Sequence, residues 1–573
     1  MKSIPRVSLA VLFSIAALCA PAKADPDFGP NVLVFDASMK DIQAQLDKIA
    51  AQQKNAQFGD ARYAYLFKPG KYDVNVEIGY YVQVLGLGQN PDDVIITGDV
   101  RSNSTLPQNN VTCAFWRAVE NFSYTGNDFG WALSQGTDMR RIHAHGDVSL
   151  STHGWASGGF TADCEIDGKQ DAGTQQQWFT RNSEIGSCTG GNWSMVYVGV
   201  PNAPAKWPIN TSVEYAPAIA EKPVLWIDKD GKYNVTVPPL RKECSGTDWS
   251  ERWKLDSATQ SLQTTSPPAK PDRIIPIDQF YIAHADKDTA ASINTALAAG
   301  KNLLITPGIY HLEESLNVTK PDTVVLGLGY ATLIPDKGTP AIKVADVDGV
   351  RIGGLILQAS PVNSPTLLQI GDAKTGKSHA ENPTIIYDIF TRVGGAGPGS
   401  ADAMVTINSN DVIGDNAWLW RADHGNGASW TGAKNKNGLI VNGDNVIYYG
   451  LAVEHTQEYQ TLWNGNGGRV YFYQSEMPYD VPAGVKGWAS YKVADTVTTH
   501  EAWGLGMYSY YLKSPVVLES EIETPVAPGI KFHHMVHLKL GAQGALHHII
   551  NSDGPPAVPD RTAIYLDEWP VAK

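Results

Sequence analysis

Three carboxylates, Asp423, Glu454 and Glu476, each lie at the end of a strand-like stretch in the second half of the chain. The interval from each to the next suits one coil of a solenoid, and equivalent positions of successive coils stack about 4.8 Å apart, so the three side chains would share one face. Carboxylates that close cannot all ionise easily, so at least one keeps its proton near neutral pH. A protonated acid beside an ionised carboxylate is the combination that cleaves a glycosidic bond.

The neighbouring residues are of the types that bind sugars. Tyr479, Trp463 and Trp178 offer aromatic faces for stacking, and Gln176, within the run 175–177, offers an amide for sugar hydroxyls. The same aromatic residues could equally belong to a hydrophobic core. Carboxylates in solenoids also cap turns, bind calcium or face water, so the spacing alone leaves both a catalytic and a structural role open.

The strand-like stretches that carry the acids predict the fold. They recur at short intervals and are separated by Asn-Gly, Asp-Asn and Gly-Gly turns, at 350–357, 385–393, 412–422, 446–454 and 470–476. This pattern favours an all-β chain that forms a right-handed parallel β-helix, with a β-sandwich or a propeller as the alternatives.

An internal repeat indicates two such β-helices in tandem. The first half contains Pro69-Gly70-Lys71-Tyr72 followed by Gly86-Leu87-Gly88, and the second half contains Pro307-Gly308-Ile309-Tyr310 followed by Gly327-Leu328-Gly329. The interval from Pro69 to Pro307 nearly equals the interval from Gly86 to Gly327, which argues for two homologous halves. Apolar residues at helical spacing precede each copy, so each half is expected to open with a short helix.

An N-terminal signal peptide and a linker define the expected domains. Lys2 and Arg6, an apolar run over 7–20 and the small-residue pattern Ala22-Lys23-Ala24 predict a signal peptide, 1–24, cleaved after Ala24. We therefore expect a secreted or periplasmic protein. A Pro-rich segment predicts a linker at 266–273, between an N-terminal β-helix, 25–265, and a C-terminal β-helix, 274–573, that carries the main catalytic residues.

Composition excludes several classes of partner. The chain has 573 residues, with 43% hydrophobic and 18% charged residues and a formal net charge of -14. That charge would repel a phosphate backbone, so no nucleic acid is expected. No apolar run after the signal peptide is long enough for a membrane span, and a large two-solenoid chain buries its own core, so we expect no membrane partner and a monomer.

Four cysteines remain in the exported chain, all in its first half. The interval from Cys164 to Cys188 is close to one expected coil, and we hypothesise a disulfide between them. Neither CxxC nor HExxH occurs, so no metal and no cofactor is expected.

The residues around the acids resemble a known family. Glu454-His455 with Tyr459-Gln460, followed by Gln474-Ser475-Glu476-Met477-Pro478-Tyr479, is similar to the catalytic region of glycoside hydrolase family 55, exported β-1,3-glucanases built from two tandem β-helices. The likeness of motif is local, and the likeness of architecture covers nearly all of the mature chain. The opening Phe35-Asp36-Ala37-Ser38 departs from the Gly-Asp-Gly-x-x-Asp-Asp type common in such enzymes, so the chain resembles a divergent branch of the family.

The resemblance implies roles for individual residues. Glu476 would be the general acid, Glu454 and Asp423 would belong to its proton network, Gln176 would help to place substrate or water, and Tyr479 would line the sugar pocket. It also implies an inverting, exo-acting hydrolysis of a laminarin-like β-1,3-glucan.

Two other functions stay open at this level. A polysaccharide lyase, or another β-helix glycanase on a different glycan, would share the fold, although lyases of anionic chains need basic residues where this site is acidic. A non-catalytic glycan-binding surface protein would need only the aromatic residues.

Overall fold

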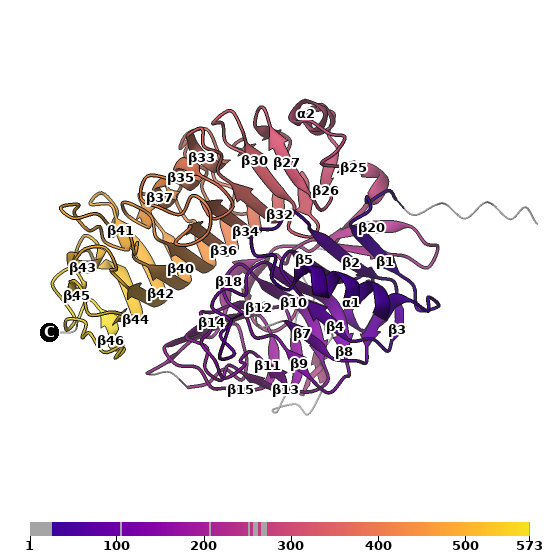
Figure 1. Cartoon of the computed structure of the whole chain (residues 1–573), viewed down its shortest axis with the longest axis horizontal. Helices are drawn as coiled ribbons and strands as arrows, with labels where there is room; N and C mark the ends of the chain where they lie inside the picture. Colours follow the sequence, from indigo (N-terminus) through magenta and orange to yellow (C-terminus); the bar gives the residue numbers. More distant parts are fainter. Residues whose placement is uncertain are drawn as a thin grey trace, which may run out of the picture.

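The computed structural model describes residues 26–571 except 103–105, 206–207, 250–252, 256–261 and 265–271. The expected signal peptide and most of the expected linker lie outside the described residues. Within them the chain is almost entirely β-structure, and two solenoids meet along one side, the first coloured indigo to magenta and the second pink to yellow (Figure 1). Among the described residues no helix is long and apolar enough to cross a membrane.

The first solenoid is a parallel β-helix, as predicted. Its strands belong to one 17-stranded parallel sheet that winds around a core of inward-facing apolar residues. They are β1 (Val32–Phe35), β2 (Tyr63–Phe67), β3 (Gly70–Tyr72), β4 (Val76–Ile78), β5 (Val82–Gly86), β6 (Val94–Ile96), β7 (Val100–Ser102), β8 (Arg117–Tyr124), β9 (Phe129–Gly130), β10 (Asp138–Ala144), β11 (Val148–Ser149), β12 (Phe160–Ala162), β13 (Glu165–Asp171), β14 (Gln177–Arg181), β15 (Glu184–Thr189), β16 (Ser194–Val198) and β17 (Asn210–Val213).

The parallel coils end earlier than residue 265, the boundary expected from the sequence. After β17 the chain forms antiparallel strand pairs instead of completing further parallel coils. These strands are β18 (Ala216–Ile219), β19 (Val224–Ile227), β20 (Tyr233–Val237), β21 (Arg241–Cys244), β22 (Trp253–Leu255), β23 (Leu262–Thr264) and β24 (Arg273–Pro276).

The second solenoid has two main sheets, of 13 and 9 strands. The first contains β25 (Phe280–Ala283), β26 (Asn302–Ile305), β27 (Ile309–Leu312), β29 (Val324–Gly327), β30 (Thr332–Pro335), β32 (Arg351–Gln358), β34 (Ile385–Val393), β36 (Ile413–Arg421), β38 (Ile447–Glu454), β40 (Gly468–Glu476), β42 (Thr499–Ser509), β44 (Gly529–Lys539) and the antiparallel β46 (Ile564–Trp569). The second contains β28 (Leu316–Val318), β31 (Ile342–Val344), β33 (Ser364–Ile370), β35 (Gly399–Ile407), β37 (Ala433–Val441), β39 (Thr461–Trp463), β41 (Tyr491–Val493), β43 (Val517–Glu523) and β45 (Ala545–Ile550).

The repeated halves open alike. Each starts with a short helix, α1 (Ile42–Gln53) and α2 (Ala290–Ala298), and Thr289 caps α2 by accepting a hydrogen bond from the Ser292 amide. Single 3₁₀ turns lie at η1 (Pro91–Asp93) and η2 (Ile277–Gln279). The tyrosines of the two Pro-Gly-x-Tyr motifs also match, because the hydroxyls of Tyr72 and Tyr310 each donate to backbone carbonyls of the opening strand and of the turn before the motif. The motif therefore ties the first coil to the next in both halves.

Charged side chains join the two solenoids at the seam. Arg140, on β10 of the first solenoid, forms ion pairs with Asp388 (2.7 Å) and Asp415 (2.8 Å) of the second, and all three are buried. Arg181 of β14 reaches the same Asp415 at 2.7 Å and Glu221 at 2.6 Å. Burial raises the pKa of Glu221, but the attraction of Arg181 outweighs burial and lowers this pKa to about 2. This network fixes the relative position of the two solenoids, on which the site below depends.

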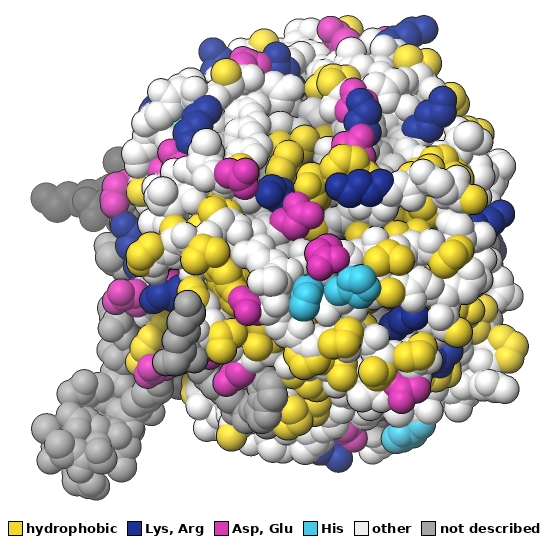
Figure 2. All heavy atoms as spheres, turned by 90° about the vertical axis from the view of Figure 1, so that its left-hand side faces the viewer, with side chains coloured by type: hydrophobic (Ala, Val, Ile, Leu, Met, Phe, Trp, Pro, Cys, Tyr) yellow, Lys and Arg dark blue, Asp and Glu magenta, His cyan; other side chains and the backbone are white. Residues whose placement is uncertain are grey.

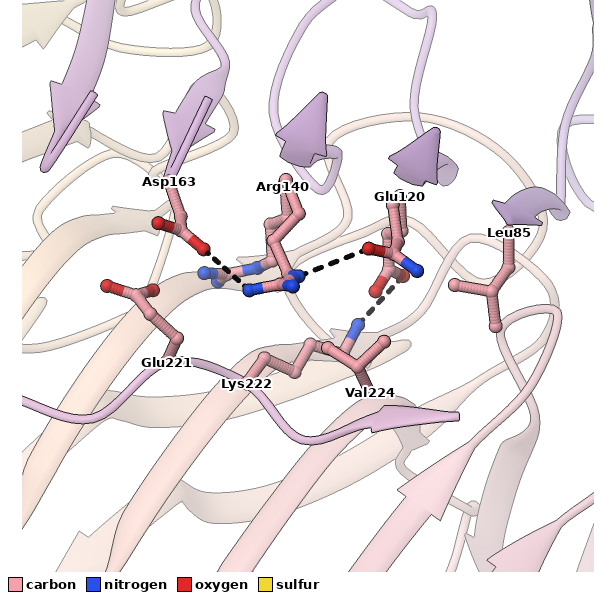
Figure 3. Close-up of a pocket in the computed structure, with 9 residues that line it drawn as sticks. Leu85, Glu120, Arg140, Asp163, Glu221, Lys222 and Val224 are labelled. Carbon is pink, nitrogen blue, oxygen red and sulfur yellow. Dashed lines mark hydrogen bonds and ion pairs between the residues drawn. The ribbon is translucent and has the colours of Figure 1, made fainter. Parts of the chain in front are cut away.

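Figure 3 shows part of this seam. Glu120, Arg140 and Asp163 descend from strands of the first solenoid, and Glu221 and Lys222 rise from the segment between the solenoids. Lys222 bonds Glu120 at 2.9 Å and Asp388 at 3.0 Å. The cavity among these side chains is only about 10 Å³, so this interface is closely packed and has no space for a sugar.

The two cysteines of the hypothesised disulfide are not bonded, and the disulfide hypothesis is wrong. Both are free thiols in the structure. The coils in this region are shorter than expected, since Glu165 pairs with Glu184 and Gln170 pairs with Cys188. The ladder therefore places Gln170, and not Cys164, opposite Cys188.

Charged side chains of both signs lie on the surface (Figure 2). On the face shown in Figure 2, lysine and arginine side chains of the described residues are scattered among acidic and apolar ones and do not gather into a band.

Candidate active site

Glu454 and Glu476 are cross-strand neighbours, and this register is the core of the site. Glu454 ends β38 and Glu476 ends β40, and the two are directly paired in the parallel ladder. Neighbouring parallel strands lie about 4.8 Å apart, so both carboxyl groups leave the same edge of the sheet. The predicted stacking of these two residues is confirmed.

Asp423 enters the site in a different way from the one expected. The spacing in the sequence placed it opposite Glu454, but the ladder pairs Trp420 with Glu454, so Asp423 lies beyond the end of β36. It is nevertheless close enough for its charge to raise the pKa of Glu476. The side chain of Asp423 accepts a hydrogen bond from His424 at 2.8 Å. Burial opposes ionisation, but His424 and His455 hold the pKa of Asp423 below its usual value, so Asp423 is the ionised member of the group.

Glu454 is almost completely buried and is held from both sides. The side-chain amide of Gln135, from the first solenoid, donates to Oε1 at 2.8 Å, and the indole N–H of Trp418 donates to Oε2 at 2.8 Å. Burial and then the neighbouring charge of Glu476 raise the pKa of Glu454 well above its ordinary value. Gln474 also faces Glu454 and lowers the pKa of Glu454. The side-chain nitrogen and oxygen of Gln474 make no hydrogen bond of normal geometry. Ionisation of Glu476 therefore makes ionisation of Glu454 less favourable.

Glu476 is the more accessible of the two, with 14% of its side chain exposed. The Tyr479 hydroxyl donates to its Oε2, and the Nε2 atom of His455 lies 3.7 Å from the same oxygen. His455 bonds the Met477 carbonyl through Nδ1, so Nε2 is directed at the carboxyl group. Burial raises the pKa of Glu476, against the stabilising contacts of His455 and Tyr479.

A buried ion pair holds the segment that carries Tyr479. Arg421, the last residue of β36, bonds both oxygens of Asp480 at 2.8 and 2.9 Å and the His455 carbonyl at 3.1 Å. The ends of three successive coils are thus fixed together beside Glu476.

A small cavity lies where the two solenoids meet. It measures about 20 Å³, enough for one water molecule, and opens beside the Glu454 network. The Ser157 hydroxyl donates to the side-chain oxygen Oε1 of Gln135 at 2.8 Å, which orients the side-chain amide of Gln135 towards Glu454. Gln135, Ser157, Trp418 and Gln474 all contribute to its lining.

Three of the expected sugar-binding residues lie elsewhere, and these predictions are corrected. Trp463 points into the core of the second solenoid, and Trp178 points into the core of the first, where its indole N–H donates to Thr161. Gln176 is buried, and its backbone carbonyl accepts hydrogen bonds from the backbone amides of Trp193 and Ser194. The glutamine whose side-chain amide reaches Glu454 is Gln135. The inward or outward direction of a side chain depends on the coil's exact register, which composition does not reveal.

Sequence reasoning missed Gln135 because it lies 319 residues from Glu454 in the chain. No local motif marks it; only the packing of one solenoid on the other brings the two together. It also missed the aromatic residues that line the seam beside the acids, namely Phe58, Tyr81, Phe115, Trp116, Trp418 and Trp420.

The chain is similar to known proteins over most of its length. Residues 280–476 match the model of the LAM55 pectate lyase-like domain. A curated protein named exo-beta-1,3-glucanase, from Streptomyces sp. (strain SirexAA-E / ActE), is 43% identical over 552 residues, which cover 94% of this chain and 88% of that protein.

Solved structures match over the same length. The structure of sacteLam55A from Streptomyces sp. SirexAA-E is 42% identical and superposes with a TM-score of 0.88, covering 95% of this chain and 99% of that chain. A variant of the same protein in complex with glucose is also 42% identical over the same shares of each chain and superposes with a TM-score of 0.90.

Proposed function

Because the chain belongs to glycoside hydrolase family 55, we propose that it hydrolyses β-1,3-glucan from the chain ends, using the carboxyl groups of Glu454 and Glu476. The observation that carries this proposal is the direct pairing of those two residues at the edge of β38 and β40. Identity of 43% over nearly the whole chain to a named exo-beta-1,3-glucanase supports the substrate and the mode of attack.

Glu476 serves as the general acid in this mechanism. It is the partly exposed member of the pair, so a glycosidic oxygen can reach it, and Tyr479 and His455 orient its carboxyl group. Protonation of the leaving oxygen lowers the barrier to cleavage of the anomeric bond. Asp423 keeps a negative charge nearby, which favours the protonated form of Glu476 before the reaction.

Glu454 serves as the acceptor for the proton of the attacking water while Glu476 holds its own proton, because a neutral Glu476 no longer raises the pKa of Glu454. Its two N–H contacts, from Gln135 and Trp418, fix its position and stabilise its charge. The adjacent cavity has room for one water molecule, and Gln135 and Trp418, which both donate to Glu454, line it. Attack by that water on the face opposite the leaving group inverts the anomeric centre.

Product analysis tests the proposal. The purified protein should release glucose from laminarin without a ladder of intermediate oligosaccharides, and proton NMR of the earliest product should show the α-anomer. A β-anomer appearing first would overturn inversion, and a ladder of long oligosaccharides would overturn attack from the chain ends. Pectate and alginate serve as controls, because an unsaturated product absorbing in the ultraviolet would identify a lyase.

We propose in addition that the protein is exported and acts as a monomer. The basic, apolar and small-residue segments of 1–24 support export. N-terminal sequencing of the protein from the culture medium or periplasm should begin at Asp25, and light scattering should give the mass of one chain.

A further inference from the structure

A cluster of metal-binding side chain types lies on the first solenoid, away from the catalytic carboxylates. It consists of Asp92, His143, His145, Glu165 and Asp167. The cluster contains two overlapping sets of three donors, and within each set the ligand atoms lie within 4.8 Å of one another. One set is Asp92, His143 and His145, and the other is His143, Glu165 and Asp167.

The β-helix itself assembles the cluster. His143 pairs with Glu165 in the ladder between β10 and β13, and alternate residues of a strand point to the same side. His145 and Asp167 therefore form the next row on that side, and His145 Nδ1 lies 3.1 Å from Asp167 Oδ2. The 3₁₀ turn η1 adds Asp92 from an earlier coil.

Asp92 sets the proton position of His143. Its Oδ1 lies 2.7 Å from Nδ1 of His143, so the imidazole donates there and leaves the lone pair on Nε2. A carboxylate that orients an imidazole in this way is the usual outer partner of a metal-bound histidine. Nε2 is therefore the atom that is prepared to bind a cation.

Two carboxylate oxygens converge on that Nε2 atom. Glu165 Oε1 lies 3.8 Å from it and Asp167 Oδ2 lies 3.7 Å from it. These distances are too long for hydrogen bonds. They are close to the ~3.4 Å that separates two ligands bound to one tetrahedral Zn²⁺ at about 2.1 Å, so shifts of a few tenths of an ångström would close the site.

Burial and charge also favour a cation. The side chains of His143 and Glu165 are only 11% and 12% exposed, whereas Asp167 is 46% exposed, so the inner donors are held in place and the outer one leaves a path from solvent. Three carboxylates against two imidazoles leave a negative cluster even with one histidine charged. Mixed nitrogen and oxygen donors suit a divalent transition metal better than calcium or magnesium.

We propose that His143, Glu165 and Asp167 bind a divalent transition metal, with Zn²⁺ as the probe and Asp92 as the outer carboxylate. The metal would join two successive coils of the first solenoid. From the sequence we expected no metal, because neither CxxC nor HExxH occurs. The donors found here come from different coils and form no such short motif.

Calorimetric titration of the tag-free, chelator-treated protein with ZnCl₂ tests the proposal. We expect one site with a dissociation constant in the low micromolar range or tighter, and a rise of several degrees in Tm with saturating Zn²⁺. Asp92→Asn should weaken binding by roughly 10- to 100-fold, as loss of an outer partner does. His143→Ala should abolish binding.

His311→Ala is the matched control, because His311 also pairs with an aspartate, Asp336, at 3.0 Å. Among the described residues it forms an ion pair with no second carboxylate. This variant should bind Zn²⁺ as the parent does. Asp167→Asn, at an exposed position, serves if His143→Ala does not fold.

The proposal is overturned if the parent shows no saturable binding, or if the folded His143→Ala or Asp167→Asn variant binds Zn²⁺ with unchanged affinity. Laminarin hydrolysis should be retained in all these variants, so the outcome is independent of the proposed catalytic mechanism.

Discussion

Replacing Glu476 with glutamine tests the assignment of the general acid most directly. Glutamine has the same shape and keeps an oxygen that can accept the Tyr479 hydrogen bond, so the change removes the transferable proton and little else. General acid catalysis contributes roughly 10²- to 10⁴-fold. We therefore expect kcat on laminarin to fall by that factor, equivalent to about 3 to 5 kcal/mol of transition-state stabilisation, with little change in KM.

The leaving group provides an internal control for this prediction. An aryl β-glucoside needs less proton assistance, because its phenolate leaves readily. Glu476→Gln should therefore lose less activity on that substrate than on laminarin. The assay measures initial rates on both substrates, with circular dichroism to show that the variant is folded.

Two results would refute the reasoning. Near-normal laminarin hydrolysis by the folded variant would mean that the acid is Glu454 or Asp423. An equal loss on both substrates would mean that Glu476 supports binding or the attack of water and does not donate the proton.

Three further predictions concern charge and stability. Asp423→Asn removes the charge that raises the pKa of Glu476, so the basic limb of the kcat/KM profile should move to lower pH; an unmoved limb would contradict the coupling. Glu521 is buried and its pKa is raised to about 8, so its ionisation destabilises the fold progressively from about pH 4.5 up to about pH 8. Glu521→Gln should then raise the free energy of unfolding at pH 9, by up to about 5 kcal/mol, and leave it nearly unchanged at pH 5, as denaturant titration at both pH values will test. Arg181→Met leaves two buried carboxylates at the seam short of a partner and should cost about 3 kcal/mol or more, and a Tm within a degree of the parent would show that the seam tolerates the loss.

Local sequence was sufficient for the fold class and for the principal acid pair. Strand periodicity predicted the coils, and the repeated Pro-Gly-x-Tyr motif predicted the two halves, because each coil is one short unit that contacts mainly its neighbours. Glu454 and Glu476 end neighbouring strands of one sheet, so their separation by one coil translates directly into a cross-strand pair. Where coil lengths varied, the same reasoning failed: Cys188 pairs with Gln170 instead of Cys164, and Asp423 lies beyond Trp420, the residue that pairs with Glu454.

The sequence by itself therefore determined the architecture, the type of chemistry and the two central carboxylates, all of which depend on contacts between adjacent coils. Only the tertiary structure decided which amide holds Glu454, because Gln135 comes from the other solenoid. It also decided that Trp463 and Trp178 are core residues, since a shift of one residue in register turns a side chain from the surface to the core. Packing of one solenoid on the other is set by buried ion pairs between distant residues such as Arg140 and Asp388, and no local pattern encodes that contact.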